Sequence, residues 1–294
     1  MISINNPKFD IAAMTADDCA AAGTIVPHKR VLQGFANSAL KAAAVSWLVV
    51  AAIGQLMFVY YLLFLYGAAA ARGDWLVLNK VMPHGYVPGD SAGNFAIVLH
   101  IFLAVIIVVG GLIQLIPAVR QRAPTLHRWN GRVFLFAVCL TSLAGLYMLW
   151  IRGSVGDFTQ HLGSTLGAVL IWLCAIMALR HALARQLVVH RRWALRLYLV
   201  ANAVWFYRIG LMFWILLNHG PAGFDPDTFT GPTLSFLSFA QTLLPLAVLE
   251  VYFAAQRRAG AVARIGFAAG LFLLTVAIGV GIFGALMGMW LPKI

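Results

Sequence analysis

Seven apolar runs in the chain are each long enough to cross a lipid bilayer, and they limit the protein to a membrane fold. A helix needs about 20 mostly apolar residues to span the hydrocarbon core. The runs cover residues 43–66, 95–119, 133–151, 162–179, 197–217, 233–255 and 265–290. Transmembrane strands would alternate apolar and polar residues over about ten positions, and these runs are continuous. The sequence therefore predicts an all-α polytopic membrane protein with about seven transmembrane helices.

The composition excludes a water-soluble globular protein. Hydrophobic residues make up 62% of the 294 residues and charged residues only 10%, whereas soluble domains have about 45–50% and about 25%. The formal net charge of +12 does not indicate nucleic acid as a partner, because the basic residues interrupt apolar runs and form no single patch. We expect the lipid bilayer to surround the protein.

The distribution of Lys and Arg predicts the orientation of the chain. Sixteen of the 21 basic residues fall in the N-terminal stretch and the loops on the same side of the membrane. Cytoplasmic loops carry such an excess, so we expect the N-terminus in the cytoplasm and the C-terminus outside. The expected organisation is a cytoplasmic tail over 1–40 and a seven-helix domain over 41–294. Within that domain, helices 2–5 are expected to form a four-helix core bundle over 95–217.

Four histidines lie at membrane depth in a repeating order. His100 is about two turns inside the second helix from the outer face, and His161 opens the fourth helix on that side. His127 and His190 open the third and fifth helices from the cytoplasmic side. The outer pair is 61 residues apart and the inner pair 63, so the second hairpin resembles a repeat of the first.

If the bundle brings helix 2 to face helix 4 and helix 3 to face helix 5, the histidines form two pairs. A six-coordinate b-type haem needs one imidazole on each side of its iron. We therefore expect His100 and His161 to ligate an outer haem, and His127 and His190 an inner one.

Three arginines are expected to assist cofactor binding. Arg128 and Arg191 stand beside the inner histidines and could neutralise haem propionates. Arg208 is deep in the 197–217 run, where a charge calls for a partner. That partner could be a propionate, a quinone oxygen or an anionic substrate.

This arrangement is similar to the two-haem transmembrane cytochromes b of the ascorbate-dependent and ferric-reductase type. In that group the second and fourth helices hold one haem, and the third and fifth hold the other. The resemblance covers residues 95–217 and implies haem ligation by His100, His161, His127 and His190.

The chain also resembles a family of predicted bacterial membrane proteins of uncharacterised function. Its pattern is an H-R-x-x-G-R-x-[FY] segment opening one helix and an H-R-x-W-x-x-R-x-Y segment opening another, followed by a membrane arginine. This chain carries HRWNGRVF at 127–134, HRRWALRLY at 190–198, and then Arg208. The resemblance implies a place in the bacterial inner (plasma) membrane and supplies no reaction.

Simpler roles remain open for these residues. His100 could make a hydrogen bond between helices to Ser164 or Thr165, and His127 and His190 could be interfacial anchors.

Arg208 could instead bond to backbone carbonyls or extend outward to the interface. Glu250 is expected to pair with Arg257 or another arginine of the inner loops, and Gln114 to bond between helices.

The function that we expect is transmembrane electron transport by two b-type haems, with one haem or none as the alternatives. The donor would be a quinol, an ascorbate-like reductant or a partner membrane subunit, and an oxidoreductase activity stays open. A cofactor-free scaffold or accessory subunit is a second hypothesis. A third is a small-molecule transporter that uses Arg208 and His100.

Overall fold

Almost all of the chain that the structure describes is helical. The computed structural model describes residues 16–81 and 85–294, with side chains from residue 30 onward. The main α-helices are α1 (Ala16–Leu62), α3 (Ser91–Leu115), α5 (Pro124–Tyr147), α6 (Phe158–Leu183), α7 (Leu187–Ala201), α8 (Ala203–Leu217), α9 (Pro232–Arg258) and α10 (Ala261–Ala285). Two shorter α-helices, α2 (Ala68–Arg72) and α4 (Pro117–Arg122), lie between them.

Short π and 3₁₀ turns complete the helical structure. The π turns extend α1, α5 and α10 over Leu63–Gly67, Met148–Gly153 and Leu286–Trp290, and the 3₁₀ turns cover Trp75–Lys80 and Leu291–Lys293. No strand forms among the described residues, where a single isolated bridge joins Asp225 to Thr230.

The spans confirm the predicted all-α polytopic membrane fold. In the described part of the chain, six helices are long and apolar enough to cross a bilayer. The α7–α8 pair makes a seventh span when it is counted as one bent helix. Proline stands in the first turn of α4, α5 and α9, where its missing N–H costs no helical hydrogen bond.

The fifth span is broken, which the continuous apolar run over 197–217 did not predict. Asn202 separates α7 from α8, and the two helices meet at 53°. Its side-chain amide donates a 2.8 Å hydrogen bond to the carbonyl oxygen of Tyr198. An Asn side chain that bonds to nearby backbone offers the chain an alternative to the regular helix, so the helix ends there.

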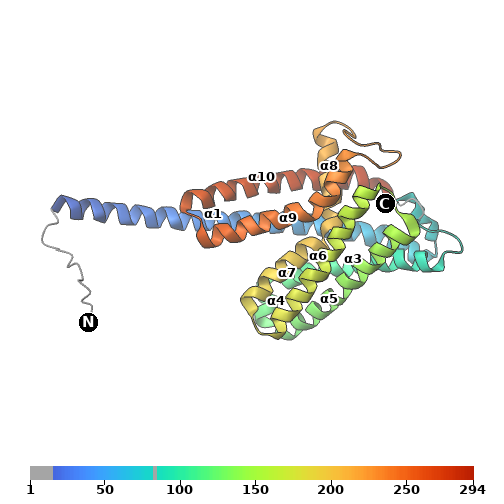
Figure 1. The fold of residues 1–294 in the computed structure, drawn as a ribbon, viewed down its shortest axis with the longest axis horizontal. Helices are drawn as coiled ribbons and strands as arrows, with labels where there is room; N and C mark the ends of the chain where they lie inside the picture. The colour runs from blue at the N-terminus through green and yellow to red at the C-terminus, as the bar shows by residue number, and fades with distance from the viewer. Residues whose placement is uncertain (1–15, 82–84) are drawn as a thin grey trace, which may run out of the picture.

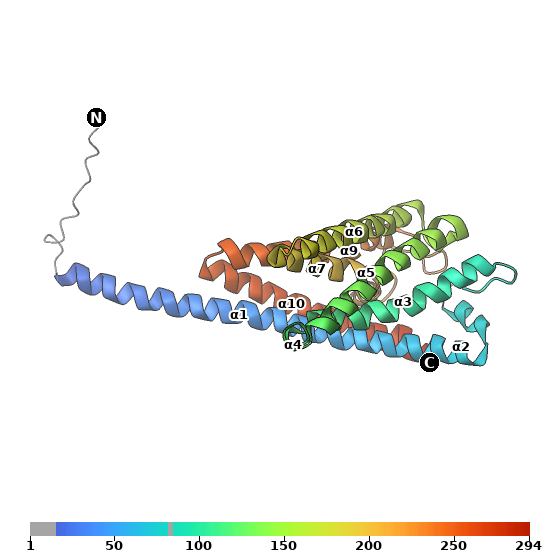
Figure 2. The same ribbon diagram turned by 90° about the horizontal axis from the view of Figure 1, so that it is seen from below.

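The helices form two groups that diverge from the end of the molecule near α8 (Figure 1). In one group α1 packs along α10, and α9 lies between this pair and the other group, packed mainly against α6 and α8. The N-terminal part of α1 projects beyond α9 and α10 (Figure 2). Residues 1–15 of the expected N-terminal tail lie outside the described residues, and α1 is already helical from Ala16.

The second group is the core bundle of α3, α5, α6 and α7. In it α3 packs along α5, α6 packs along α7, and α5 contacts α6. The ring of Tyr198 on α7 meets α3 at Gly111, where an added Cβ atom would lie 3.1 Å from the ring. The four helices therefore follow one another around the bundle in the order α3, α5, α6, α7, and α7 is again next to α3. This order places α3 diagonally from α6, and α5 diagonally from α7.

Candidate functional site

His100 on α3 is held by its neighbour α5. Its Nδ1 atom lies 3.1 Å from the carbonyl oxygen of Thr141, and an added Cβ on Gly145 would lie 3.4 Å from its Cε1 atom. A carbonyl oxygen can only accept a hydrogen bond, so Nδ1 carries the proton and Nε2 keeps a lone pair. The hydrogen bond between helices thus exists, but its partner is neither Ser164 nor Thr165.

His190 on α7 is held in the same way by α6. Its Nδ1 atom donates a 2.9 Å hydrogen bond to the carbonyl oxygen of Ala178, which again leaves Nε2 with a lone pair. Metal-ligating histidines almost always donate their other ring N–H to a carbonyl, a carboxylate or water, because that bond fixes the tautomer and the ring orientation. His100 and His190 both have this arrangement.

The other two histidines carry buried ring nitrogens without a hydrogen-bond partner among the described residues. These atoms are Nε2 of His161 and Nδ1 of His127. The His161 ring meets the Trp150 ring edge to face, with centroids 5.5 Å apart. A buried polar atom without a partner is costly, so each of these nitrogens is available to a ligand.

His127, His190 and Arg120 lie in the same region of the bundle. His127 is close enough to both His190 and Arg120 to interact electrostatically. Arg128 bonds to the hydroxyl of Thr125 at 3.3 Å in an exposed position. The sequence indicated Arg128, whereas Arg120 at the end of α4 is the arginine beside His127. In the sequence, Arg120 could have been noticed because it lies in the same short basic loop as Arg128, just before His127.

Arg191 is an exposed residue of α7, which contacts α9. It lies near Tyr252, close enough to interact electrostatically with the phenol. The adjacent residue His190 turns toward α6 instead. Residues one position apart on a helix point in different directions, so His190 and Arg191 reach different neighbours.

Arg208 on α8 lies in a cluster with His100 and three tyrosines, which we call the Arg208 cluster. The guanidinium is near enough to interact electrostatically with His100 and with the phenols of Tyr61, Tyr66 and Tyr207. Its Cζ atom lies 5.3 Å from the centroid of the Phe58 ring.

Arg208 has little hydrogen bonding of its own. Within the described part of the chain, its one hydrogen bond is a long contact of 3.4 Å from Nη1 to the carbonyl oxygen of Val204. Among the described residues no carboxylate forms a salt bridge with it. The tyrosines around it escaped the sequence analysis, because they are spread over α1 and α8 and carry no motif.

The Arg208 cluster also extends toward α6, the helix of His161. Tyr207, next to Arg208, interacts electrostatically with Asp157. Asp157 caps α6 one turn before His161 and accepts a 2.8 Å hydrogen bond from the backbone N–H of Gln160. The arrangement therefore groups His100, Arg208 and the beginning of α6 at one end of the bundle. No hydrogen bond or ring contact joins His100 to His161 in the described chain.

A packed apolar core fills the bundle between its helices. It includes Leu103 and Ile107 of α3, Phe134 and Val138 of α5, and Leu197 of α7, all at most 6% exposed. All four helices contribute to it, because Cys174 of α6 is also a member.

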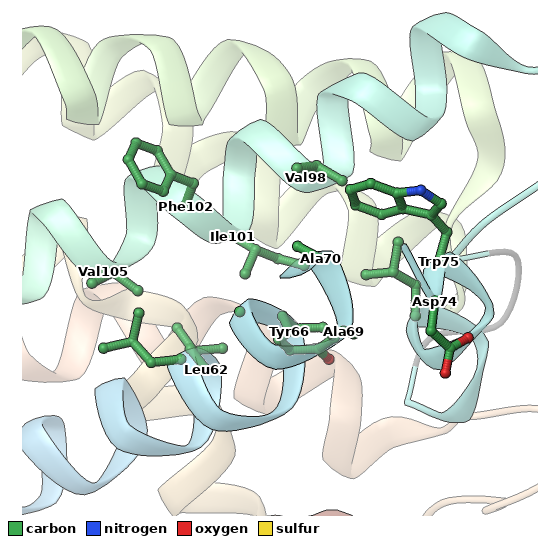
Figure 3. A pocket seen from close by; sticks show the side chains of 13 residues that line it. Leu62, Tyr66, Ala69, Ala70, Asp74, Trp75, Val98, Ile101, Phe102 and Val105 are labelled. Atoms are coloured by element: carbon green, nitrogen blue, oxygen red, sulfur yellow. The ribbon is translucent and has the colours of Figure 1, made fainter. Parts of the chain in front are cut away.

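A separate apolar cavity of about 130 Å³ lies between the end of α1 and α3 (Figure 3). Trp75, Val98 and Phe102 stand around it, and the carboxylate of Asp74 points away from it. None of the four histidines lines this cavity. The cavity lies on the side of the bundle and is separate from the four histidines.

Groups of three or more His, Cys, Asp or Glu side chains that could hold a metal ion do not occur among the described residues. A haem iron differs from such sites, because the porphyrin supplies four nitrogens and the protein supplies only axial ligands.

Comparison with known proteins gives a family resemblance for the bundle. Residues 97–230 match a family described as a predicted membrane protein (DUF2306). The match includes both His-Arg segments and the α7–α8 break, and the description states no cofactor or reaction. No curated protein and no solved structure matches the chain. Over the core bundle and α8, the chain is thus similar to a predicted membrane protein family, as the two His-Arg motifs indicated.

Proposed function

We propose that the protein is a transmembrane electron carrier with two b-type haems, one held by His100 and His161 and the other by His127 and His190. The observation that supports this most directly is the state of the four imidazoles. Two are fixed through Nδ1 to backbone carbonyls of a neighbouring helix, and two have buried nitrogens without partners.

The helix arrangement supports the same pairing. His100 and His161 come from α3 and α6, and His127 and His190 come from α5 and α7. Both pairs join helices that lie diagonally in the bundle, and cofactor sites in helix bundles are built from side chains on facing helices. Two imidazoles per site also suit the donor set that a b-type haem requires.

The chain itself would orient the ligands and set their surroundings. The carbonyls of Thr141 and Ala178 hold the rings of His100 and His190, so that each Nε2 is presented in one direction. Arg208 places positive charge beside His100, and Arg120 does so beside His127. A haem, when bound, supplies the reversible one-electron chemistry of its iron.

The proposal also includes the membrane and the electron donor. The excess of arginines on one side suggests a cytoplasmic N-terminus in a bacterial inner membrane. The donor would be a quinol, an ascorbate-like reductant or a partner membrane subunit. Arg208 could then bind a haem propionate or an oxygen of the donor.

A visible spectrum of the purified protein tests the proposal. We expect a red preparation whose absorption bands sharpen on reduction with dithionite. His100→Ala and His161→Ala should each remove the same haem population, and His127→Ala and His190→Ala the other. His219→Ala, in the outer loop, is the control and should leave both. A colourless preparation of the correctly folded protein contradicts the proposal and favours a cofactor-free scaffold or accessory subunit.

A transporter is the second candidate, and the break between α7 and α8 favours it. Transporters often place their binding sites at discontinuous helices, and Arg208 lies on α8 six residues after the break at Asn202. Uptake of an anionic substrate into proteoliposomes that is lost in Arg208→Ala would support this function. A red, redox-active protein without uptake would exclude it.

A further inference from the structure

Three guanidinium groups gather around Phe253 near the end of α9. Arg192 and Arg196 of α7 lie over its ring, with their Cζ atoms 5.7 Å and 5.6 Å from the ring centroid. Arg257, one turn further along α9, donates a 3.2 Å hydrogen bond from Nε to the carbonyl oxygen of Phe253. We call Arg192, Arg196 and Arg257 the Phe253 arginine cluster.

The charge of this cluster is only partly balanced. Glu250 forms a salt bridge with Arg196, with 2.6 Å between Oε1 and Nη2. Neither Arg192 nor Arg257 forms a salt bridge in the part of the chain that the structure describes. Three positive groups and one negative group leave a local charge of +2. An anion is therefore the ligand that the cluster favours.

The surroundings hold the guanidinium groups in place before any ligand arrives. Arg196 is stacked over Trp193 at 4.7 Å as well as over Phe253. Phe253 itself is only 6% exposed, so its ring is a fixed platform. Arginines that are already oriented lose less conformational entropy on binding than free surface arginines do.

The position of the cluster points to a lipid as the source of the anion. It lies where α7 begins and α9 ends, at the arginine-rich ends of both helices. Basic pockets between transmembrane helices at this depth bind anionic headgroups.

We propose that the Phe253 arginine cluster binds the phosphodiester of an anionic phospholipid where α7 contacts α9. The phosphate oxygens accept hydrogen bonds from Arg192 and Arg257, and Arg196 stays paired with Glu250. The acyl chains then lie along the apolar flank of α9. This site is separate from the histidines and does not depend on haem binding.

Lipid titration with native mass spectrometry tests this site. The probes are dioleoyl-phosphatidylglycerol and dioleoyl-phosphatidylcholine, each added to the full chain in detergent. We expect the phosphatidylglycerol to bind more tightly, and Arg192→Gln to weaken it by roughly tenfold. The control, Arg122→Gln, removes the same charge from the exposed end of α4 and should change binding by less than about twofold.

Three outcomes would overturn the proposal. The first is equal binding of the two lipids, and the second is equal weakening by Arg192→Gln and Arg122→Gln. The third is competition by millimolar inorganic phosphate, which would mean that the cluster takes a free anion. Should Arg192→Gln fail to fold, Arg257→Gln replaces it, because that change leaves the ion pair of Arg196 and Glu250 intact.

Discussion

The hydroxyl of Tyr198 on α7 donates a 2.8 Å hydrogen bond to Oε1 of Gln55 on α1. Gln55 is fully buried and Tyr198 is 3% exposed. This bond links the two groups of helices at the point where α7 is about to end. A polar contact at this depth has no water to replace it, so its loss leaves a buried polar atom unpaired.

Tyr198→Phe should therefore destabilise the protein by about 1–3 kcal/mol, because Oε1 of Gln55 loses its donor. Thermal unfolding in detergent measures the effect, with Tyr60→Phe as the control, since Tyr60 is 57% exposed. Adding Gln55→Leu to Tyr198→Phe removes the unpaired atom and should recover part of the loss. Equal stability of wild type and Tyr198→Phe would contradict this interpretation.

Gly163→Ala should weaken the contact between α6 and α9. An added Cβ atom would lie 2.8 Å from the carbonyl carbon of Ser238 and would also clash with the Ser238 hydroxyl. The backbone must shift, at a cost of about 1–3 kcal/mol.

Gly270→Ala is the matched control, because nothing lies within 4 Å of its added Cβ on α10. That change should be neutral or stabilising by up to about 1 kcal/mol, because Gly is a poor helix former. Both variants are compared by their unfolding midpoints, and a Gly163→Ala midpoint at or above that of Gly270→Ala would be inconsistent with the close packing.

Gly145 provides the space that the His100 ring occupies. An added Cβ at 3.4 Å is an ordinary contact, so Gly145→Ala should keep the ring in place. Gly145→Leu is too large and should displace the ring from the carbonyl of Thr141. If His100 ligates a haem, Gly145→Leu loses about half of the haem per protein and Gly145→Ala does not. Equal haem content in the two variants would show that His100 is not a haem ligand.

Acid should loosen the start of α6 through Asp157. The backbone N–H of Gln160 donates to this carboxylate and holds its pKa below the ordinary value. A lowered pKa in the folded state adds stability above the unfolded pKa of about 3.9, and that stability is lost as the pH falls through the folded value.

Asp157→Asn keeps an oxygen that can cap the helix but cannot titrate. The unfolding midpoint of the wild type should therefore fall more steeply than that of Asp157→Asn below about pH 4. Parallel curves for the two proteins would show that this cap carries no acid dependence.

Two polar residues make the kinds of contact that the sequence predicted. Gln114 makes the expected bond between helices, because its Nε2 donates a 2.8 Å hydrogen bond to the carbonyl oxygen of His127. Glu250 pairs with an inner-loop arginine as expected, but with Arg196 and not with Arg257. The type of partner followed from chemistry, whereas its identity depended on which helices are adjacent.

The sequence by itself determined the membrane class, the all-α fold and the approximate spans, because hydrocarbon admits only long apolar segments whose backbone bonds are internal. It did not predict the break at Asn202, since one amide inside an apolar run gives no sign of bonding to Tyr198. The tertiary structure alone decided that His100 rests on Thr141 and that Arg208 meets three tyrosines. These contacts join residues from different helices, and helix packing, unlike a span, depends on the shapes of all the neighbouring side chains.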